Sequence, residues 1–166
     1  IEDDQVALSE TFSKIEKDDA NARQKVNIYA NRLHGIKRYM DKRNLPGIPQ
    51  SFLTIFFTAS DNTEALLSEL ESDRVNIENA NRLLDILTND MTELEEETYR
   101  LVQNATLTEQ LLQYSNRYRS FDDHVQAAFD EALYIFEREY DYPASFKVIS
   151  DALELIEPGV TERFVT

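Results

Sequence analysis

The sequence predicts an all-α protein, an elongated antiparallel three-helix bundle built from long coiled-coil helices. Its apolar residues recur at alternating spacings of four and three, the pattern of helices that pack along a narrow seam. Only 3 Gly and 4 Pro occur among 166 residues, too few for the frequent turns of a many-stranded β protein. Charged residues make up 30% of the chain, which suits long helices exposed to water.

The first predicted helix covers residues 3–43. Its apolar seam runs from Leu8 to Met40, and the only position at which an apolar residue is missing is Asp19. The segment NLPGIPQ at residues 44–50 then predicts a loop, because its Pro and Gly residues interrupt helices.

The second predicted helix covers residues 51–105. The same alternation restarts at Phe52 and continues to Ala105, with Asp73 as its one clear violation. At about 1.5 Å per residue, the two helices would span roughly 55–60 Å and 80 Å, and these lengths predict a rod.

The last third of the chain predicts three shorter helices, at residues 107–119, 122–140 and 143–156. Either Thr106 or Thr108 would cap the first of them, and Asp122 would cap the second. Pro143 fits the first turn of the third helix, where a missing backbone N–H costs nothing. The tail VTERFVT would add one more turn.

These helices predict one arrangement over a single helical region, residues 1–166. The short loop makes the first two helices antiparallel neighbours, and the broken third segment has the length to return along the second. The expected result is an up-down-up bundle in the manner of spectrin repeats.

The expected register places Asp19 within about a turn of Asp73, and two interpretations stay open. In one, both carboxylates join a buried polar layer with Arg23, Arg74 or Arg138 as counter-charge, because an unpaired buried carboxylate is costly. In the other, the seam rotates outward and both carboxylates are solvated, which is the commoner situation for Asp.

The net charge of −15 limits the partners that the chain can have. Such an acidic surface repels phosphate backbones and anionic lipid headgroups, so we expect no nucleic-acid binding and no broad electrostatic contact with a membrane. No cysteine is present, which excludes disulfides, and no apolar run approaches the roughly 20 residues of a membrane span. The chain begins at Ile1 within a polar stretch, and we expect it to be a piece of a longer protein.

The charges are distributed unevenly along the chain. Residues 23–43 carry 7 Lys/Arg and one acid, whereas residues 61–97 carry 12 acids and only Arg74 and Arg82. These charges either set the pairing of the antiparallel helices or leave an acidic surplus for a basic partner.

Residue patterns typical of catalysis or metal binding are missing. Neither His34 nor His124 has a Glu three positions before it, so the Glu-x-x-His pairs of di-iron bundles are absent. The three glycines are isolated, and the run ELEEE at residues 93–97 places Leu94 inward with its acidic neighbours in water. We therefore expect no enzyme activity, no cofactor, no metal and no small-molecule substrate.

The segment LLQYSNRYRS at residues 111–120 contains the candidate binding face. Gln113, Asn116 and Arg117 share one side of a helix, while Tyr114 and Tyr118 fall beside Leu111 and are expected to pack there. Amide groups and a guanidinium suit an extended peptide or a carboxylate. The alternative interpretation is an ordinary solvated helix face.

Two segments resemble one family, the septation ring formation regulators called EzrA. The stretch QYSNRYRS is similar to a family patch of the form Gln-Tyr-x-Asn-Arg-Tyr-Arg, and ALYIFEREYDYPASFKVISDALELIEPG is similar to the region that follows it. The resemblance is specific from Leu111 to Thr166, and before Ala105 only the heptad character agrees.

The resemblance implies a bacterial cell-division regulator and scaffold. Members carry one N-terminal membrane helix, absent here, and a rod of spectrin-like repeats at the cytoplasmic face of the membrane at the division septum. They bind the tubulin-like protein FtsZ and other division proteins, and they restrain ring assembly. The patch implied in septal placement, and so in partner binding, comprises Gln113, Tyr114, Ser115, Asn116, Arg117, Tyr118 and Arg119.

Two alternatives remain open. The chain could be a structural coiled-coil spacer with no specific binding face. Residues 140–159 also resemble half of a tetratricopeptide repeat, but no second copy of that pattern occurs.

Overall fold

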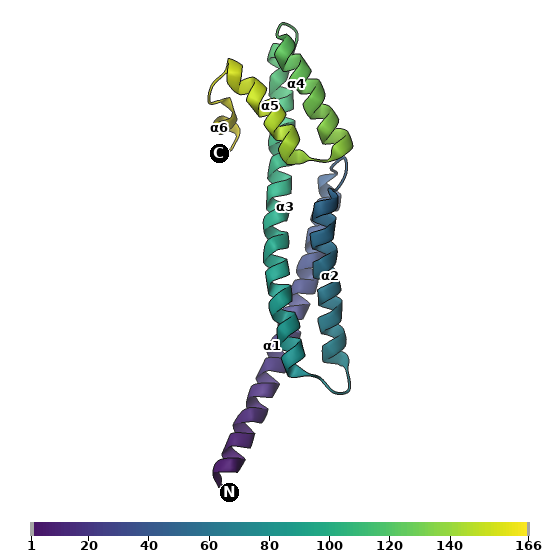
Figure 1. Ribbon diagram of the computed structural model, residues 1–166, viewed down its shortest axis with the longest axis vertical. Coiled ribbons are helices and arrows are strands. Elements are labelled where there is room, and N and C mark those ends of the chain that lie inside the picture. The colour runs from purple at the N-terminus through teal and green to yellow at the C-terminus, as the bar shows by residue number, and fades with distance from the viewer. Residues whose placement is uncertain (1, 166) are drawn as a thin grey trace. The chain divides into compact units, whose positions relative to one another are not determined.

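The structure is a computed structural model that describes the backbone of residues 2–165 and the side chains of residues 10, 13, 14 and 16–165. No strand occurs within these residues, and the predicted all-α class is confirmed. Figure 1 shows the elements in chain order: α1 (Glu2–Arg43), α2 (Gln50–Glu71), α3 (Ile77–Arg119), α4 (Asp123–Tyr134), the π-helical turn η1 (Ile135–Glu139), α5 (Tyr142–Ile156) and α6 (Val160–Val165).

The chain divides into two compact units, where the sequence predicts a single region. The N-terminal unit comprises residues 1–42 and 54–95, and the C-terminal unit comprises residues 43–53 and 96–166. Helix α3 contributes residues to both.

In the N-terminal unit, α1, α2 and the first part of α3 lie side by side (Figure 1). The hydrogen bond between Asp18 and Asn81 and the ion pair between Arg32 and Glu95 both join positions 63 apart. A constant offset means that α1 and α3 run parallel. Helix α2 runs antiparallel to both, because it leads from the C-terminal end of α1 back to the N-terminal end of α3. An offset of 63 is nine heptads, so the two seams stay in phase.

The predicted continuous helix over residues 51–105 is wrong. Helix α2 ends at Glu71, and α3 begins at Ile77. In the turn between them, the Ser72 hydroxyl donates to the carbonyl of Glu69 at 2.9 Å, and the Asn76 side chain accepts the N–H of Asn79 at 3.1 Å. Asn76 therefore caps α3, although Leu70 and Ile77, on either side of the turn, keep the same heptad phase.

The predicted break between residues 105 and 107 is also wrong, because α3 passes through this point without interruption. Thr108 is fully buried, and its hydroxyl donates to the carbonyl of Asn104 at 2.7 Å. This bond satisfies the hydroxyl inside the helix, so Thr108 caps nothing.

The two core-breaking aspartates form no shared buried layer. Asp73 lies in the turn after α2 and is exposed. Asp19 is half-buried, and its carboxylate accepts the Nε–H of Arg23 at 2.9 Å. Arg23 also donates to the carbonyl of Leu70 at 2.6 Å, so this one guanidinium both neutralises Asp19 and ties α1 to the end of α2.

The C-terminal unit is built from the second part of α3 and the elements that follow it. Asp122 accepts the N–H of Val125 at 3.0 Å, so the predicted cap of α4 is confirmed. The predicted helix over residues 122–140 ends instead in η1, and Tyr140 adopts a left-handed backbone with φ 58°. Asp141 caps α5 through the N–H of Ala144 at 3.1 Å. The expected extra turn is α6.

One apolar cluster holds α3, α4, α5 and α6 together. Its fully or nearly fully buried members are Leu111, Leu112, Ala132, Ile149, Leu153 and Val160. Burial of such side chains contributes about 1.5–3 kcal/mol each before the entropy of ordering the chain is subtracted.

The loop before α2 is anchored within the same unit. The hydroxyl of Tyr142 donates to the carbonyl of Gly47 at 2.6 Å, and Arg43 pairs with Glu109 at 3.1 Å. A Cβ atom added at Gly47 would lie 2.3 Å from the ring of Tyr140, so any larger residue would force that ring to move. Among the described residues, no helix combines the length and apolarity needed to cross a membrane.

Candidate functional site: a polar patch near the end of α3

Residues 113–119 occupy the last two turns of α3 and lie against the apolar cluster of the C-terminal unit. Gln113, Asn116 and Arg117 are exposed, as the spacing predicts. Tyr114 and Tyr118 are half-buried and pack against the cluster that contains Leu111, also as predicted. The structure therefore separates the polar face from the aromatic face of this segment.

Ser115 and Arg119 do not belong to the exposed face. Ser115 is fully buried, and its hydroxyl donates to the carbonyl of Leu112 at 2.6 Å. The guanidinium of Arg119 lies 3.5 Å from the ring centroid of Phe129 and donates to Gln126 at 3.1 Å. Arg119 therefore ties α3 to α4, and Ser115 is enclosed in the packed interior, so only part of the seven-residue segment is open to a partner.

The two tyrosines share one carboxylate from the segment between α5 and α6. The hydroxyls of Tyr114 and Tyr118 both donate to Oε2 of Glu157, and the Tyr118 bond measures 3.0 Å. Arg163 of α6 pairs with the other oxygen of Glu157 at 2.5 Å. We call this set of four side chains the Glu157 cluster.

These contacts change the acidity of the groups. The hydrogen bonds from Tyr114 and Arg163 to the carboxylate lower the pKa of Glu157 from 4.5 to about 2. Burial, followed by the hydrogen bond to Glu157, raises the pKa of Tyr118, because both disfavour a phenolate at that place. The cluster thus holds Glu157 charged and Tyr118 neutral at physiological pH.

Arg117 is ordered by the same cluster. Its guanidinium lies 3.8 Å from the ring centroid of Tyr114 and donates to the Tyr114 hydroxyl at 3.0 Å. Stacking of this kind removes much of the freedom of an exposed arginine side chain. A carboxylate or peptide carbonyl that approached Arg117 would meet a guanidinium already held in position.

Beside this arginine lies a shallow depression of about 420 Å³. Its wall includes Gln113, Tyr114 and Arg117 of α3, together with Phe164 of α6. Tyr114 and Phe164 meet edge to face, with ring centroids 5.4 Å apart. The patch is therefore built from two segments that are distant in the sequence.

The sequence interpretation missed Glu157, Arg163 and Phe164. The sequence predicts one more helical turn over residues 160–166, and it predicts no contact for Glu157. Nothing in their local pattern reveals that they contact residues more than 35 positions earlier. Among the described residues, no group of three or more His, Cys, Asp and Glu is placed to hold a metal ion.

The fold and the patch define an all-α protein that presents ordered polar side chains on a helix face. The chain belongs to the family of septation ring formation regulators, EzrA, whose family model matches residues 1–166.

Two curated relatives illustrate the match. The chain is 72% identical over its full length to the septation ring formation regulator EzrA of Streptococcus sanguinis strain SK36. It is 69% identical to the protein of the same name from Streptococcus pneumoniae strain Hungary19A-6. In each case the chain spans 29% of the relative's length. No solved structure matches the chain significantly.

Proposed function

We propose that this chain is part of a cell-division scaffold that binds FtsZ and other division proteins and restrains assembly of the division ring. It acts by presenting surfaces and not by performing a reaction. In the longer protein a membrane helix outside this chain would hold it at the cytoplasmic face of the membrane, at the septum.

The observation that carries the proposal is the exposed trio of Gln113, Asn116 and Arg117 on an ordered backbone. Two amides and a stacked guanidinium offer donors for the carbonyls and carboxylates of an extended peptide. The Glu157 cluster fixes Arg117 from behind through Tyr114, so this guanidinium loses little conformational entropy when a peptide binds. Tyr114, Ser115, Tyr118 and Arg119 contribute to the proposed site by positioning these three.

The finer architecture belongs to the same proposal. The side-by-side packing of α1, α2 and α3 in the N-terminal unit supports an elongated, spectrin-like repeat. In-phase heptads would allow the pattern to recur along a longer protein. Such a repeat would give the scaffold a defined reach between its partners.

The test replaces Gln113, Asn116 and Arg117 together with alanine. We expect helicity and melting temperature to stay near those of the parent, because the three side chains are exposed. Co-sedimentation with FtsZ polymers, with and without the FtsZ tail, and septal placement in cells should both fall. The matched control replaces Gln24, Asn27 and Asn31, three exposed polar residues of α1, and should leave both measurements unchanged.

The alternative is a structural spacer with no specific binding face. It is favoured if the triple variant folds and co-sediments like the parent chain. If the variant loses its fold, the patch is structural.

A further inference from the structure

The depression beside Arg117 is lined by a set of residues that overlaps the proposed trio only in part. Its α3 side consists of Gln110, Gln113, Tyr114 and Arg117. These positions follow the spacing i, i+3, i+4 and i+7, which places them on one face of the helix. Phe164 contributes to the lining from α6. The depression therefore combines two amides and a guanidinium with a pair of aromatic rings.

Asn116, the third member of the trio, does not line the depression. It lies six positions after Gln110, so it falls on a neighbouring face of α3. Its side-chain oxygen accepts a hydrogen bond from Arg119 at 2.8 Å, and Arg119 in turn stacks on Phe129 of α4. Asn116 therefore supports the contact between α3 and α4 and does not belong to the wall of the depression.

Arg117 is held in the depression by an aromatic residue and not by a carboxylate. Its Nη1 donates to the Tyr114 hydroxyl at 3.0 Å, and it forms no ion pair with a described carboxylate. A guanidinium has five N–H donors in a fixed fork, so the remaining donors can bind a carboxylate through two parallel hydrogen bonds. Arg163 donates to the same hydroxyl at 3.3 Å, so a second cation lies beside the first.

The carboxylates nearest to this segment are already paired with other residues. Glu109, which precedes the lining residues of α3, pairs with Arg43 at 3.1 Å. Glu157 pairs with Arg163 and accepts the hydroxyls of the two tyrosines. Neither of these carboxylates neutralises Arg117.

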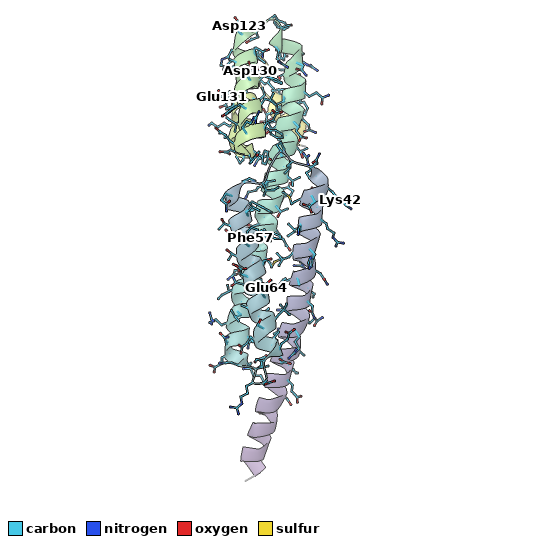
Figure 2. The ribbon with its side chains drawn as sticks, turned by 90° about the vertical axis from the view of Figure 1, so that its right-hand side faces the viewer. Lys42, Phe57, Glu64, Asp123, Asp130 and Glu131 are labelled. Carbon is cyan, nitrogen blue, oxygen red and sulfur yellow. The ribbon has the colours of Figure 1, made fainter. Side chains whose placement is uncertain are left out.

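Other carboxylates of the same unit lie away from the depression. Glu162 is two positions before Phe164, about 200° around the axis of α6. Glu154 accepts the backbone N–H groups of Gly159 and Thr161. Figure 2 shows three carboxylates along α4, an element that contributes no residue to the lining: Asp123, Asp130 and Glu131. The depression is thus locally cationic in a chain of net charge −15.

We propose that the depression binds an extended segment of a partner protein that carries a carboxylate and a large apolar side chain two residues apart. The carboxylate pairs with Arg117, and the apolar side chain packs against the rings of Tyr114 and Phe164. Side chains at i and i+2 point to the same side of an extended strand, so one segment reaches both contacts. This inference rests on the proposed function, whose binding site it narrows.

The other lining residues favour a peptide over a free anion such as phosphate. Gln110 and Gln113 lie about one helical turn apart, and each side-chain amide offers both donors and an acceptor. The alternating N–H and C=O groups of an extended backbone match both kinds of group. Phosphate would leave the amide acceptors unmatched, and it would gain nothing from the two aromatic rings.

The test uses the 166-residue chain and a synthetic peptide whose central segment reads Phe-Ser-Glu-Ser-Phe. An apolar side chain stands two residues from Glu on either side, so both orders of the two groups are present. One control peptide replaces Glu with Gln, and another replaces both Phe residues with Ser. Nuclear magnetic resonance titration follows the side-chain amide of Gln113 and the ring protons of Tyr114. We expect the first peptide to bind about tenfold or more tightly than either control.

Two variants with matched controls locate the contact. Gln110→Glu adds a carboxylate to the lining and should weaken binding of the first peptide by about tenfold. Asn89→Glu adds the same charge at an exposed position of the N-terminal unit and should not weaken it. Phe164→Ser should remove the advantage of Phe over Ser in the peptide, whereas Val165→Ser, at an exposed residue of the same helix, should preserve it.

The two variants differ in their expected effect on the fold. Phe164 also packs against the apolar cluster of the C-terminal unit, so its replacement could change the position of α6. Gln110 is exposed and makes no such contact, so Gln110→Glu tests the depression with that packing intact.

Co-sedimentation with FtsZ polymers separates this inference from the proposed function. We expect Gln110→Glu and Phe164→Ser to reduce co-sedimentation as far as the triple variant does, and Asn116→Ala to leave it unchanged. If only the triple variant reduces it, this inference is overturned and the proposed function stands. If no variant reduces it although the depression binds the peptide, the proposed function fails and the peptide site remains.

Four results would overturn the inference. The first is equal affinity for the three peptides, and the second is binding that survives both Gln110→Glu and Phe164→Ser. The third is displacement of the peptide by inorganic phosphate at constant ionic strength, which would make the depression a general anion site. The fourth is concentration-dependent self-association of the chain that Gln110→Glu abolishes, which would assign the depression to a second copy.

Discussion

The hydroxyl of Tyr114 donates a hydrogen bond to the carboxylate of Glu157, across 43 positions of sequence. This contact joins the helix face that carries the proposed binding trio to the segment that leads into α6. Arg163 pairs with the same carboxylate, so Glu157 contacts both Tyr114 of α3 and Arg163 of α6. The order of the patch therefore depends on residues outside it.

Glu157→Gln should loosen α6 without unfolding the rest of the C-terminal unit. An amide cannot pair with Arg163 and cannot accept charge-assisted hydrogen bonds from the two tyrosines. Amide hydrogen exchange in residues 160–165 should become faster by about tenfold, the change expected when a local contact is lost. Glu162→Gln is the control, since Glu162 is exposed on the same helix. Equal protection in the two variants would contradict the role of Glu157.

Acid should release α6 in a defined pH window. The pKa of Glu157 is lowered from 4.5 to about 2, so its contribution to stability is complete above pH 4.5 and is lost as the pH falls toward 2. Nuclear magnetic resonance of the ring protons of Tyr114 should report a transition within that window. In Glu157→Gln the transition should vanish. A transition that persists would have to be assigned to another carboxylate.

Substitutions at two glycines should have opposite effects on stability. Gly47→Ala places a Cβ against the ring of Tyr140, and we expect a loss of about 1–3 kcal/mol from overpacking. Gly35→Ala meets no atom within 4 Å inside α1, so it should stabilise the chain by about 0.5–1 kcal/mol through helix propensity. Chemical denaturation measures both, and the same sign for the two variants would contradict the close contact at Gly47.

The turn between α2 and α3 depends on a helix cap that a substitution can remove. Asn76→Ala deletes the side-chain acceptor of the Asn79 N–H and should cost about 0.5–2 kcal/mol. Asn89→Ala, at an exposed position within α3, supplies the control and should cost much less. Urea denaturation would measure the difference between the unfolding free energies of the two variants. Equal effects would argue that α2 and α3 are continuous.

The features that the sequence predicts correctly are local ones. Heptad spacing reveals the all-α class and the inward positions such as Leu94, which is fully buried. The cap at Asp122 and the separate faces of Gln113 and Tyr114 are also predicted from residue type and local spacing. Each depends on residues within about one turn of one another.

The features that the sequence does not reveal depend on residues distant in the sequence, or lie where a turn leaves the heptad spacing of the apolar residues unchanged. Leu70 and Ile77 are seven residues apart, so the apolar period is the same whether the helix continues or turns at Asp73. Thr108 fits a helix cap by residue type, but tertiary packing buries it inside α3, where its hydroxyl donates to the carbonyl of Asn104. The pairing of Glu157 with Tyr114 depends on tertiary packing, which periodicity does not encode.

The dependence of the patch on α6 bears on how such proteins are imaged. A fluorescent protein joined after Thr166 would follow within three residues of Arg163 and within two of Phe164, which touch Tyr114. Its bulk would strain the contacts of Arg163 and Phe164 with Tyr114, the residue that orders Arg117. If the proposed trio directs placement, such a fusion would be misplaced in cells for a reason unrelated to its partners. A reporter inserted in the exposed turn at Asp73 would leave these contacts of Tyr114 intact.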